Sequence, residues 1–489
     1  MNITKSKNFI NKDTVIIFLL LIITFGYFYL DSGYNGNTRF GLTFRLVEEG
    51  RLDLNTLDIE NQNSPLFTGD VASYNGSYYT DKAIGSSLLA AIPYAPIYWI
   101  TKLMGFSLAV ETKKHLLTFL ALGIPSAICG ALIYWLCEFL SKNRIKALLI
   151  TVFTTLGTML LPYSVTFFGH VQAGALLFSA FVLIFSIARD PQHHLYDSRT
   201  FLIGLLLGMA FMVEYPTALL ILPLIFYYFY ALAKARSLKE IKHYLYPLIG
   251  GFIPLALIAT YNLKVYGVVF ASGYEHLVDT YFRTHMSEGL MGISLPNLDV
   301  LFYETLHPAQ GLFWLSPVLL LIPVGAWIMF RDKQYRLELC FALYAAAAML
   351  IMNSGYYMWW GGNSLGPRAV IPMLPFMCIP LIFVPRRWTP ILILLGAVSV
   401  VQMLLASACQ FLIPGNFIPT IASDPFFSYS NIFSNVLVQL KDHRFGWNIG
   451  QNLLGLKTWW SLLPLLCCQL LFTLLFFWKK EITIFSMRN

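Results

Sequence analysis

The sequence predicts an all-α polytopic membrane protein with about twelve transmembrane helices and a large first outer loop that carries interfacial helices. Of its 489 residues, 57% are hydrophobic and only 12% are charged, whereas soluble domains have about a quarter charged residues. Twelve apolar runs are long enough, or nearly so, to cross a bilayer. The 33 basic against 25 acidic residues fit cytosolic loops of such a protein better than a nucleic-acid surface.

These runs follow one another along the whole chain. The first follows Lys5, Lys7 and Lys12 and is not followed by a small-residue cleavage site, so we expect an uncleaved span with a cytosolic N-terminus. Several runs are shorter than the roughly 20 residues of a perpendicular helix and need aromatic or glycine flanks. The predicted spans are Val15–Leu30, Leu116–Cys137, Ala147–Phe168, Val171–Ala188, Phe201–Val213, Thr217–Leu232, Leu245–Tyr261, Gly311–Phe330, Leu339–Met352, Ala369–Val384, Ile391–Leu412 and Trp459–Trp478.

The segment Ala83–Leu103 decides the predicted topology, because counting it as a span inverts every later loop. Its prolines, tyrosines and Trp99 suit a helix lying in the outer interface. With that placement, the short basic turns and both chain ends put most of the Lys and Arg residues on the cytosolic side, as the positive-inside rule requires. The long polar loops, where function should be sought, are therefore expected on the outer side of the membrane.

A single membrane domain over residues 1–489 is expected, because no repeat or low-complexity tract is visible. Its predicted outer loops cover 31–115, 262–310, 353–368 and 413–458. The last is either an acceptor-side element or lid, or a loosely packed connector. The chain has no Walker A loop or other nucleotide motif, and its seven cysteines lie in apolar runs without paired spacing. We therefore expect no cofactor, and the histidines of the second outer loop lack the spacing of a metal site.

The first outer loop holds the densest set of ionisable residues. Asp31 follows the first span, and Asp70 and Asp81-Lys82 flank a polar stretch. A carboxylate against an apolar wall can serve as a base toward an acceptor hydroxyl, which makes Asp31 and Asp70 rival candidates, with Asp31 preferred for its position at membrane level. Each residue also has a purely structural interpretation: Asp31 as a loop residue facing water, Asp70 as a turn residue and Asp81 as a helix cap. Lys82, at membrane level, suits a phosphate oxyanion.

Further candidates lie in the later loops. His170 and Glu214 each lie in a tight turn between spans. Glu214 needs a cationic partner there, for which Arg368 and Lys82 are the candidates. His170 is equally well interpreted as a structural histidine that is hydrogen-bonded within the bundle. The string from Tyr356 to Arg368 places glycines around Asn363, which permit close backbone approach to a ligand. Arg368 begins the next span, where it can contact a phosphate with two hydrogen bonds. Trp360 belongs either to this site or to an interfacial belt.

Several of these strings together resemble a bacterial branch of the GT-C glycosyltransferase superfamily, over about residues 10 to 410. The strings are Asn37-Thr38-Arg39-Phe40, Gly69-Asp70 through Asp81-Lys82, Gly169-His170, Glu214-Tyr215-Pro216, Trp359-Trp360-Gly361-Gly362 and Gly366-Pro367-Arg368. Relatives in that superfamily include protein O-mannosyltransferases and lipid A aminoarabinose transferases. The superfamily often has an Asp-Glu pair after the first span, where this chain has Asp31-Ser32. The aminoarabinose transferases have Asp-Lys-Pro-Pro where this chain has Asp81-Lys82-Ala83-Ile84.

The resemblance implies a GT-C-like bundle and a glycosyltransferase that uses a polyprenyl-phosphate-linked sugar donor. It also implies a bacterial cytoplasmic (inner) membrane, with the active site facing the periplasm or exterior. The acceptor is a glycan, lipid or protein, and nucleic acid is not a partner. In an inverting single displacement, Asp31 or Asp70 deprotonates the acceptor while Lys82 and Arg368 bind the donor phosphate. Arg39, Asp81, His170, Glu214, Trp360 and Asn363 are the expected supporting residues. The alternative is a non-catalytic lipid-linked sugar carrier or flippase that uses the same cations.

Overall fold

The computed structural model describes residues 9–189, 197–235, 238–362, 364–410 and 430–478. Most of this part of the chain is helical, and its strands form only two short antiparallel pairs. Seven described helices are long and apolar enough to cross a membrane, and three shorter apolar helices accompany them. The predicted all-helical membrane architecture is thus confirmed, while the number of about twelve spans stays a prediction.

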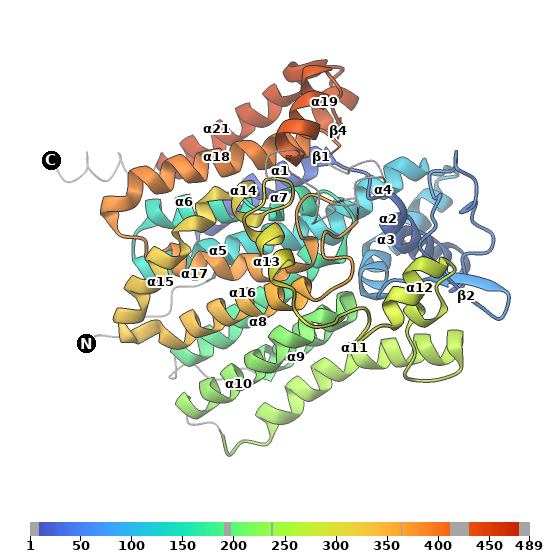
Figure 1. Cartoon of the computed structure of the whole chain (residues 1–489), viewed down its shortest axis with the longest axis horizontal. Coiled ribbons are helices and arrows are strands. Elements are labelled where there is room, and N and C mark those ends of the chain that lie inside the picture. The colour runs from blue at the N-terminus through green and yellow to red at the C-terminus, as the bar shows by residue number, and fades with distance from the viewer. Residues whose placement is uncertain (1–8, 190–196, 236–237, 363, 411–429, 479–489) are drawn as a thin grey trace.

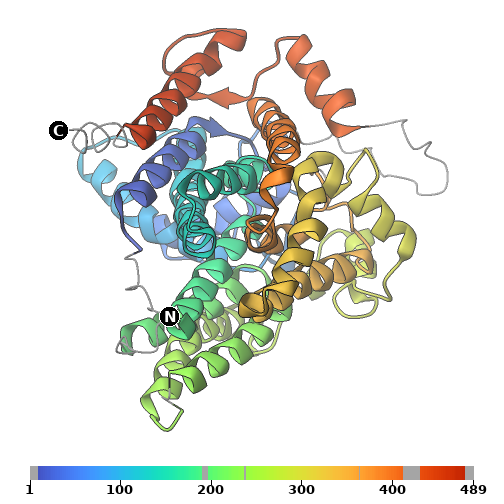
Figure 2. The ribbon, with the colours of Figure 1, turned by 90° about the vertical axis from the view of Figure 1, so that its left-hand side faces the viewer.

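The helices pack side by side into a bundle (Figures 1 and 2). Its central member is α8, of whose apolar window 78% is buried inside the protein, against 17% for the C-terminal helix at the edge. That gradient is expected for a bundle whose outer helices face lipid. The main helices are α1 (Lys12–Tyr27), α4 (Val110–Thr118) continuous through η2 (Phe119–Gly123) with α5 (Ile124–Ser141), α6 (Arg144–Thr155), α8 (Gly169–Arg189), α9 (Asp197–Val213), α10 (Ala218–Lys234), α11 (Lys242–Tyr266), α15 (Ile322–Arg331), α16 (Arg336–Ser354), α18 (Thr389–Ala408) and α21 (Leu463–Phe477).

Three predicted spans depart most strongly from a continuous α-helix. The Ala147–Phe168 run ends as α6 at Thr155 and resumes only as α7 (Leu160–Ser164), because Gly157 and Pro162 interrupt it. The Gly311–Phe330 run divides into α14 (Leu312–Leu315), the 3₁₀ turn η5 (Pro317–Leu321) and α15. Prolines lack the N–H that an α-helical hydrogen bond needs, which explains the second break.

The third exception is Ala369–Val384, which the structure makes into η7 (Arg368–Met377), a ten-residue 3₁₀ helix, followed by α17 (Cys378–Leu381). Pro372 and Pro375 lie inside η7 and remove two backbone donors. Every residue from Val370 to Met377 is nevertheless buried. This segment therefore runs through the middle of the bundle, although its helical geometry is not that of an ordinary span.

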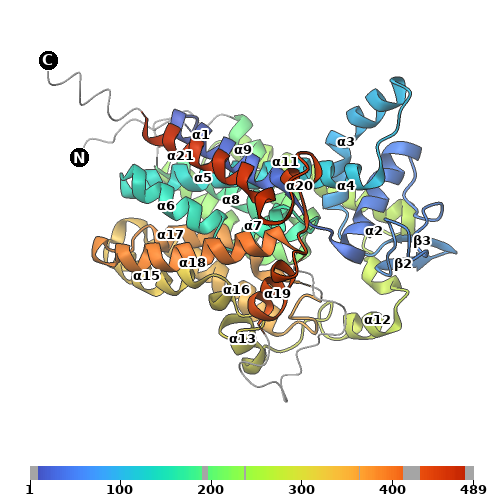
Figure 3. The ribbon, with the colours of Figure 1, turned by 90° about the horizontal axis from the view of Figure 1, so that it is seen from above.

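Elements of the first loop gather at one end of the bundle, here called the loop end, together with α12 (Figures 1 and 3). The helix α3 coincides with the predicted interfacial segment and projects from the bundle in Figure 3. The loop 31–115 is not all loop, since α4 begins at Val110 and continues into α5. Residues 411–429, most of the first half of the predicted last loop, lie outside the described residues. The loop-end elements are α2 (Gly33–Phe44), η1 (Arg45–Glu49), β2 (Val71–Tyr74), β3 (Ser77–Thr80), α3 (Gly85–Leu103), η4 (Gly273–His276), α12 (Thr280–Ser287), α13 (Leu298–Thr305), η9 (Asn431–Val436), α19 (Leu437–Lys441) and α20 (Ile449–Asn452), with β1 (Phe28–Tyr29) paired to β4 (Trp447–Asn448).

Ion pairs join the helix ends at the opposite end of the bundle. Arg144 at the start of α6 pairs with Asp13 of α1 and donates to the Phe476 carbonyl of α21. Arg189 at the end of α8 pairs with buried Glu338 of α16, 2.5 Å away. The charge argument assigned these same segments to one side of the membrane. Their contacts place them at one end of the bundle, and the side that this end faces stays a prediction.

Helices α9 and α11 approach each other through glycines. A Cβ added at Gly250 of α11 would lie 2.2 Å from the Phe201 carbonyl oxygen of α9, and one at Gly204 of α9 would lie 1.9 Å from the Pro247 carbonyl oxygen. Such distances leave no room for any side chain. Small residues allow this close approach between membrane helices, where dispersion contacts drive association.

Two neighbouring glycines of α11 provide a matched test of this packing. We expect Gly250→Ala to destabilise the protein by about 1 to 3 kcal/mol, because the added methyl group forces α9 and α11 apart. The control is Gly251→Ala, whose Cβ would lie at an ordinary 3.4 Å from the Gly204 oxygen and should leave stability within about 1 kcal/mol of wild type. Thermal unfolding in detergent measures both, and equal effects of the two variants would contradict the close packing.

Candidate functional site

A tight β-hairpin brings together the charged residues of the first loop. Strands β2 and β3 pair with Val71 opposite Thr80, and the Asn75-Gly76 turn between them has positive φ angles at both residues. Asn-Gly is favoured in such two-residue turns because both positions need a left-handed backbone. The residues that flank the paired strands, Asp70 and Asp81, therefore come to lie opposite each other.

Lys82 lies between these two carboxylates. Its Nζ is 2.9 Å from Asp70 Oδ2 and 2.6 Å from Asp81 Oδ2. Burial acts to lower the pKa of the Lys82 ammonium, but Asp70 and Asp81 outweigh it and raise the pKa above its usual value. Burial also raises the pKa of the Asp81 carboxyl, against the effect of Lys82. The ammonium group thus stays charged in a largely buried position, as a phosphate ligand requires.

A second ion pair lies between Arg39 of α2 and Glu214, which precedes η3 (Tyr215–Thr217). Arg39 Nη2 is 3.2 Å from Glu214 Oε1, and Arg39 Nη1 donates to Ser86 Oγ of α3 at 3.3 Å. His170 Nδ1, in the first turn of α8, lies 3.5 Å from the same Glu214 oxygen. The sequence predicted Arg368 or Lys82 as the partner of Glu214. That prediction is wrong, because the fold places Arg39 closer, although the sequence separation of 175 residues gave no sign of it.

Arg368 stands at the end of a glycine-rich loop. Gly361, Gly362 and Gly366 all have positive φ angles, and Ser364 Oγ donates to the Trp360 carbonyl at 2.6 Å, which closes the loop. Asn363 lies outside the described residues. The Arg368 guanidinium lies 4.5 Å from the ring centroid of Phe168. Within the described part of the chain, this guanidinium has no hydrogen bond or ion pair to a protein group.

Two tyrosines lie near enough to several of these groups for the charges to influence the pKa of the phenols. Lys82, Arg368 and Glu214 act on the pKa of Tyr356, and Lys82, Glu214 and Asp81 act on the pKa of Tyr274. Burial raises the pKa of both phenols, so each remains a neutral hydrogen-bond donor. We call this group the charged cluster: Arg39, Asp70, Asp81, Lys82, His170, Glu214 and Arg368. Sequence reasoning had named its members separately, and folding brings them together.

Asp31 belongs to a different group of residues. Its Oδ1 lies 2.9 Å from Nζ of Lys114 in α4, and its side chain is 47% exposed, whereas Lys114 is buried. Lys114 also donates to the Pro65 carbonyl at 3.1 Å and lies over the Phe40 ring. Neighbouring residues of α2 therefore face different groups, Arg39 toward the charged cluster and Phe40 toward Lys114.

Lys114 was missed by sequence reasoning, since it reads as a flanking lysine before an apolar run. Its burial comes from the continuation of α4 into the bundle, and no local pattern marks it.

In the described part of the chain, no three His, Cys, Asp or Glu side chains are grouped so that they would hold a metal ion.

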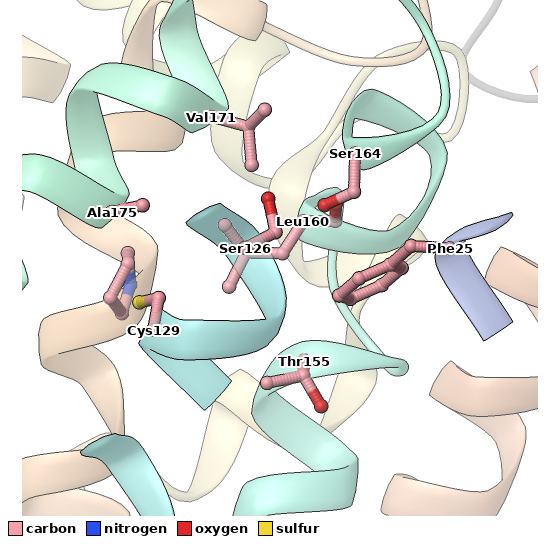
Figure 4. Close-up of a pocket in the computed structure, with 9 residues that line it drawn as sticks. Phe25, Ser126, Cys129, Thr155, Leu160, Ser164, Val171 and Ala175 are labelled. Carbon is pink, nitrogen blue, oxygen red and sulfur yellow. The ribbon is translucent and has the colours of Figure 1, made fainter. Parts of the chain in front are cut away.

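A small cavity inside the bundle has no part in the charged cluster (Figure 4). It is lined mainly by apolar groups of α1, α5, α7 and α8, including Phe25, Cys129 and Val171. It has room for no more than about one water molecule. The buried Ser126 hydroxyl lines it and has no protein partner, so this space is suited to a structural water rather than to a substrate.

The fold and the site define a polytopic helical membrane protein with a buried charged cluster at one end of its bundle. No protein-family model matches the chain, and no curated protein matches it. Among solved structures it is similar to ArnT from Cupriavidus metallidurans, whose crystal structure is described as bound to undecaprenyl phosphate. The identity is 12% and the TM-score 0.44, over 81% of this chain and 64% of that one. This chain therefore spans less than two thirds of the length of that ArnT.

A buried carboxyl group lies beside the glycine-rich loop. Glu304 of α13 is fully buried, and its Oε2 accepts a hydrogen bond of 2.5 Å from Asn353 Nδ2, which also donates to the Trp359 carbonyl. Its Oε1 is buried without a partner. Burial raises the pKa of Glu304 from 4.5 to about 8, because a carboxylate loses its hydration there. Glu304 is thus a neutral hydrogen-bonding group at neutral pH.

This shift gives the stability of the protein a definite pH dependence. The folded protein keeps the Glu304 proton up to pH about 8, whereas the unfolded chain releases it near pH 4.5. The stabilisation is complete below the lower value and is lost as pH rises toward the upper one. We expect Glu304→Gln, which stays neutral, to lose less stability than wild type between pH 5 and 8. Thermal unfolding across this range measures it, with the exposed Glu275→Gln as control, and parallel curves for wild type and Glu304→Gln would refute the assignment.

Proposed function

We propose that this protein is a glycosyltransferase that moves a sugar from a polyprenyl-phosphate donor to an acceptor at the outer face of the cytoplasmic membrane. The observation that carries the proposal is the placement of two cations: Lys82, which lies between Asp70 and Asp81, and Arg368, whose guanidinium lies over Phe168 with no hydrogen bond or ion pair to the described residues. Cations at the end of an apolar bundle suit a ligand with a charged headgroup and a long apolar chain.

Arg368 supports phosphate binding most directly. Its guanidinium carries five N–H donors, lies over the face of Phe168 and has no hydrogen bond or ion pair to the described residues. A phosphate can take two of these donors at once in a geometry that lysine does not match. Lys82 adds a point charge, and the neutral hydroxyls of Tyr356 and Tyr274 are available as further donors.

The reaction that this arrangement supports is a single displacement with inversion. A carboxylate takes the proton of the acceptor hydroxyl, the acceptor oxygen bonds to the anomeric carbon, and the bond from that carbon to the phosphate oxygen breaks. The phosphate departs with the electron pair, and Lys82 and Arg368 stabilise its negative charge. A phosphate is a good leaving group when its charge is neutralised, so no general acid is needed.

Asp70 is the proposed base. It lies 2.9 Å from Lys82, whereas Asp31 pairs with Lys114 and is half exposed to solvent. A base must share a site with the cations that hold the donor phosphate. Asp81, which is buried against Lys82, serves in this scheme to hold the ammonium group in place. The supporting roles of Arg39, Glu214 and His170 are to fix α2 and α3 against the bundle.

Donor binding is tested with alanine variants of the two cations. Lys82→Ala and Arg368→Ala should each weaken polyprenyl-phosphate binding by about 1.5 to 3 kcal/mol, because each removes a charge-assisted contact. The control is Lys102→Ala, which removes an exposed ammonium group near Trp99 of α3 and should bind like wild type. Binding to purified protein in detergent is the measurement. Unchanged affinity in both cation variants would show that the donor phosphate does not bind at the charged cluster.

The base is tested by turnover. With a panel of polyprenyl-phosphate sugars, wild type should release polyprenyl phosphate, which a carrier or flippase would not do. Asp70→Asn should reduce turnover by about 100-fold or more with little change in donor affinity, and Asp31→Asn should have the smaller effect. The reverse order would transfer the role of base to Asp31. Full activity of both variants would exclude a carboxylate base at either position.

A further inference from the structure

Amide side chains line one face of the helix formed by η9 and α19. Asn431, Asn435 and Gln439 follow one another at intervals of four residues. Asn435 Nδ2 donates to Asn431 Oδ1 at 3.3 Å, and Gln439 Nε2 donates to Asn435 Oδ1 at 2.6 Å. Gln439 Nε2 also donates to the Gln410 carbonyl at 2.7 Å. We call Gln410, Asn431, Asn435 and Gln439 the amide ladder.

The two ends of the amide ladder reach the two groups of ionisable residues described above. At one end, Asn431 Nδ2 donates to the Ser364 carbonyl at 3.4 Å, within the glycine-rich loop that precedes Arg368. At the other end, Gln410 Nε2 donates to the Asp31 carbonyl at 3.1 Å. One helix thus connects the backbone after α1 with the backbone of the loop that carries Arg368.

The position of Arg368 depends on that loop. Its guanidinium has no acceptor in the described part of the chain, and a Cβ on Gly361 would lie 3.0 Å from Arg368 Cγ. The loop backbone is held by side chains from elsewhere: Gly366 N donates to Gln310 Oε1 at 2.5 Å, and Leu365 N donates to Tyr163 Oη at 3.1 Å. The fully buried Asn431 adds a third contact to this loop, through its hydrogen bond to the Ser364 carbonyl.

Attachment of the helix does not need the amides. Its apolar face already buries Ile432, Val436 and Leu440. Hydrogen bonds between side-chain amides contribute little net stability but fix direction and distance. The amide face is therefore not needed to attach this helix to the rest of the protein. Its geometry is suited to holding two backbone segments at a fixed distance.

We propose that the amide ladder positions Arg368 for the donor phosphate by fixing the loop 361–367 relative to the segment that begins at Asp31. Asn431 is the positioning residue that contacts the loop, and Gln439 and Gln410 transmit its position to the backbone at Asp31. This inference rests on the proposed function, since it assigns the loop a phosphate-binding task.

The test uses leucine substitutions, which keep side-chain volume and remove the amide. The first variant is Asn431→Leu. Because a change at a buried residue can impair folding, the second variant is Gln439→Leu, at a less buried residue of the amide ladder. The matched control is Asn452→Leu, which removes an amide that donates to the Asn448 carbonyl at 3.0 Å in α20, outside the ladder. Two quantities are measured in the purified full-length protein: hydrogen exchange of residues 360–368, and the affinity for polyprenyl phosphate.

Both ladder variants should exchange faster over residues 360–368 and bind polyprenyl phosphate about fivefold more weakly, the worth of about one hydrogen bond, whereas the control should match wild type. In an Arg368→Ala background, Asn431→Leu should cause no further loss, because it acts through Arg368. Unchanged exchange in both ladder variants, or fully additive losses with Arg368→Ala, would overturn the inference. If wild type does not bind polyprenyl phosphate, the proposed function fails, and faster exchange would still support the link between ladder and loop.

Discussion

The arrangement of the loop end depends on the buried ion pair between Arg39 and Glu214. Leaving one partner of such a pair alone in an apolar setting costs about 3 to 5 kcal/mol, so the two side chains must meet whenever the chain folds. Their contact, with Ser86, ties α2 and α3 to the turn between α9 and α10. Lys82 lies just before α3 in the chain, and its place beside Tyr274 and Tyr356 follows from that tie.

Charge balance then determines what the site can bind. Lys82 is offset by two carboxylates and Arg39 by one, whereas Arg368 lies over the Phe168 ring and has no ion pair to the described residues. Under the proposed function, an incoming phosphate would find Arg368 available, and Lys82 would exchange one anionic partner for another. The neutral phenols of Tyr274 and Tyr356 would add donors without adding charge. This charge balance fits the proposal of one bound anion, because the three cations are already matched in number by three carboxylates when the anion is absent.

Sequence reasoning predicted the helical membrane class, the helix α3 and the residues of the charged cluster one by one, while the interfacial position of α3 stays a prediction. The predicted features have local signals, namely apolar runs and glycines around an arginine. It failed where the answer depends on distant contacts. Glu214 was paired with the wrong cation, since Arg39 lies 175 residues away in the chain. Lys114 was not noticed as the partner of Asp31, and three predicted spans contain breaks or 3₁₀ geometry that prolines and glycines impose.

The 3₁₀ helix η7 extends farther through the bundle than an α-helix of the same number of residues would. An α-helix advances about 1.5 Å per residue and a 3₁₀ helix about 2.0 Å, so ten residues reach about 20 Å rather than about 15 Å. The buried segment after Arg368 gains about 5 Å of length through its narrower winding. Hydropathy windows that assume one rise per residue undercount such segments, and the proline content of a short apolar run becomes a measure of how far it can extend.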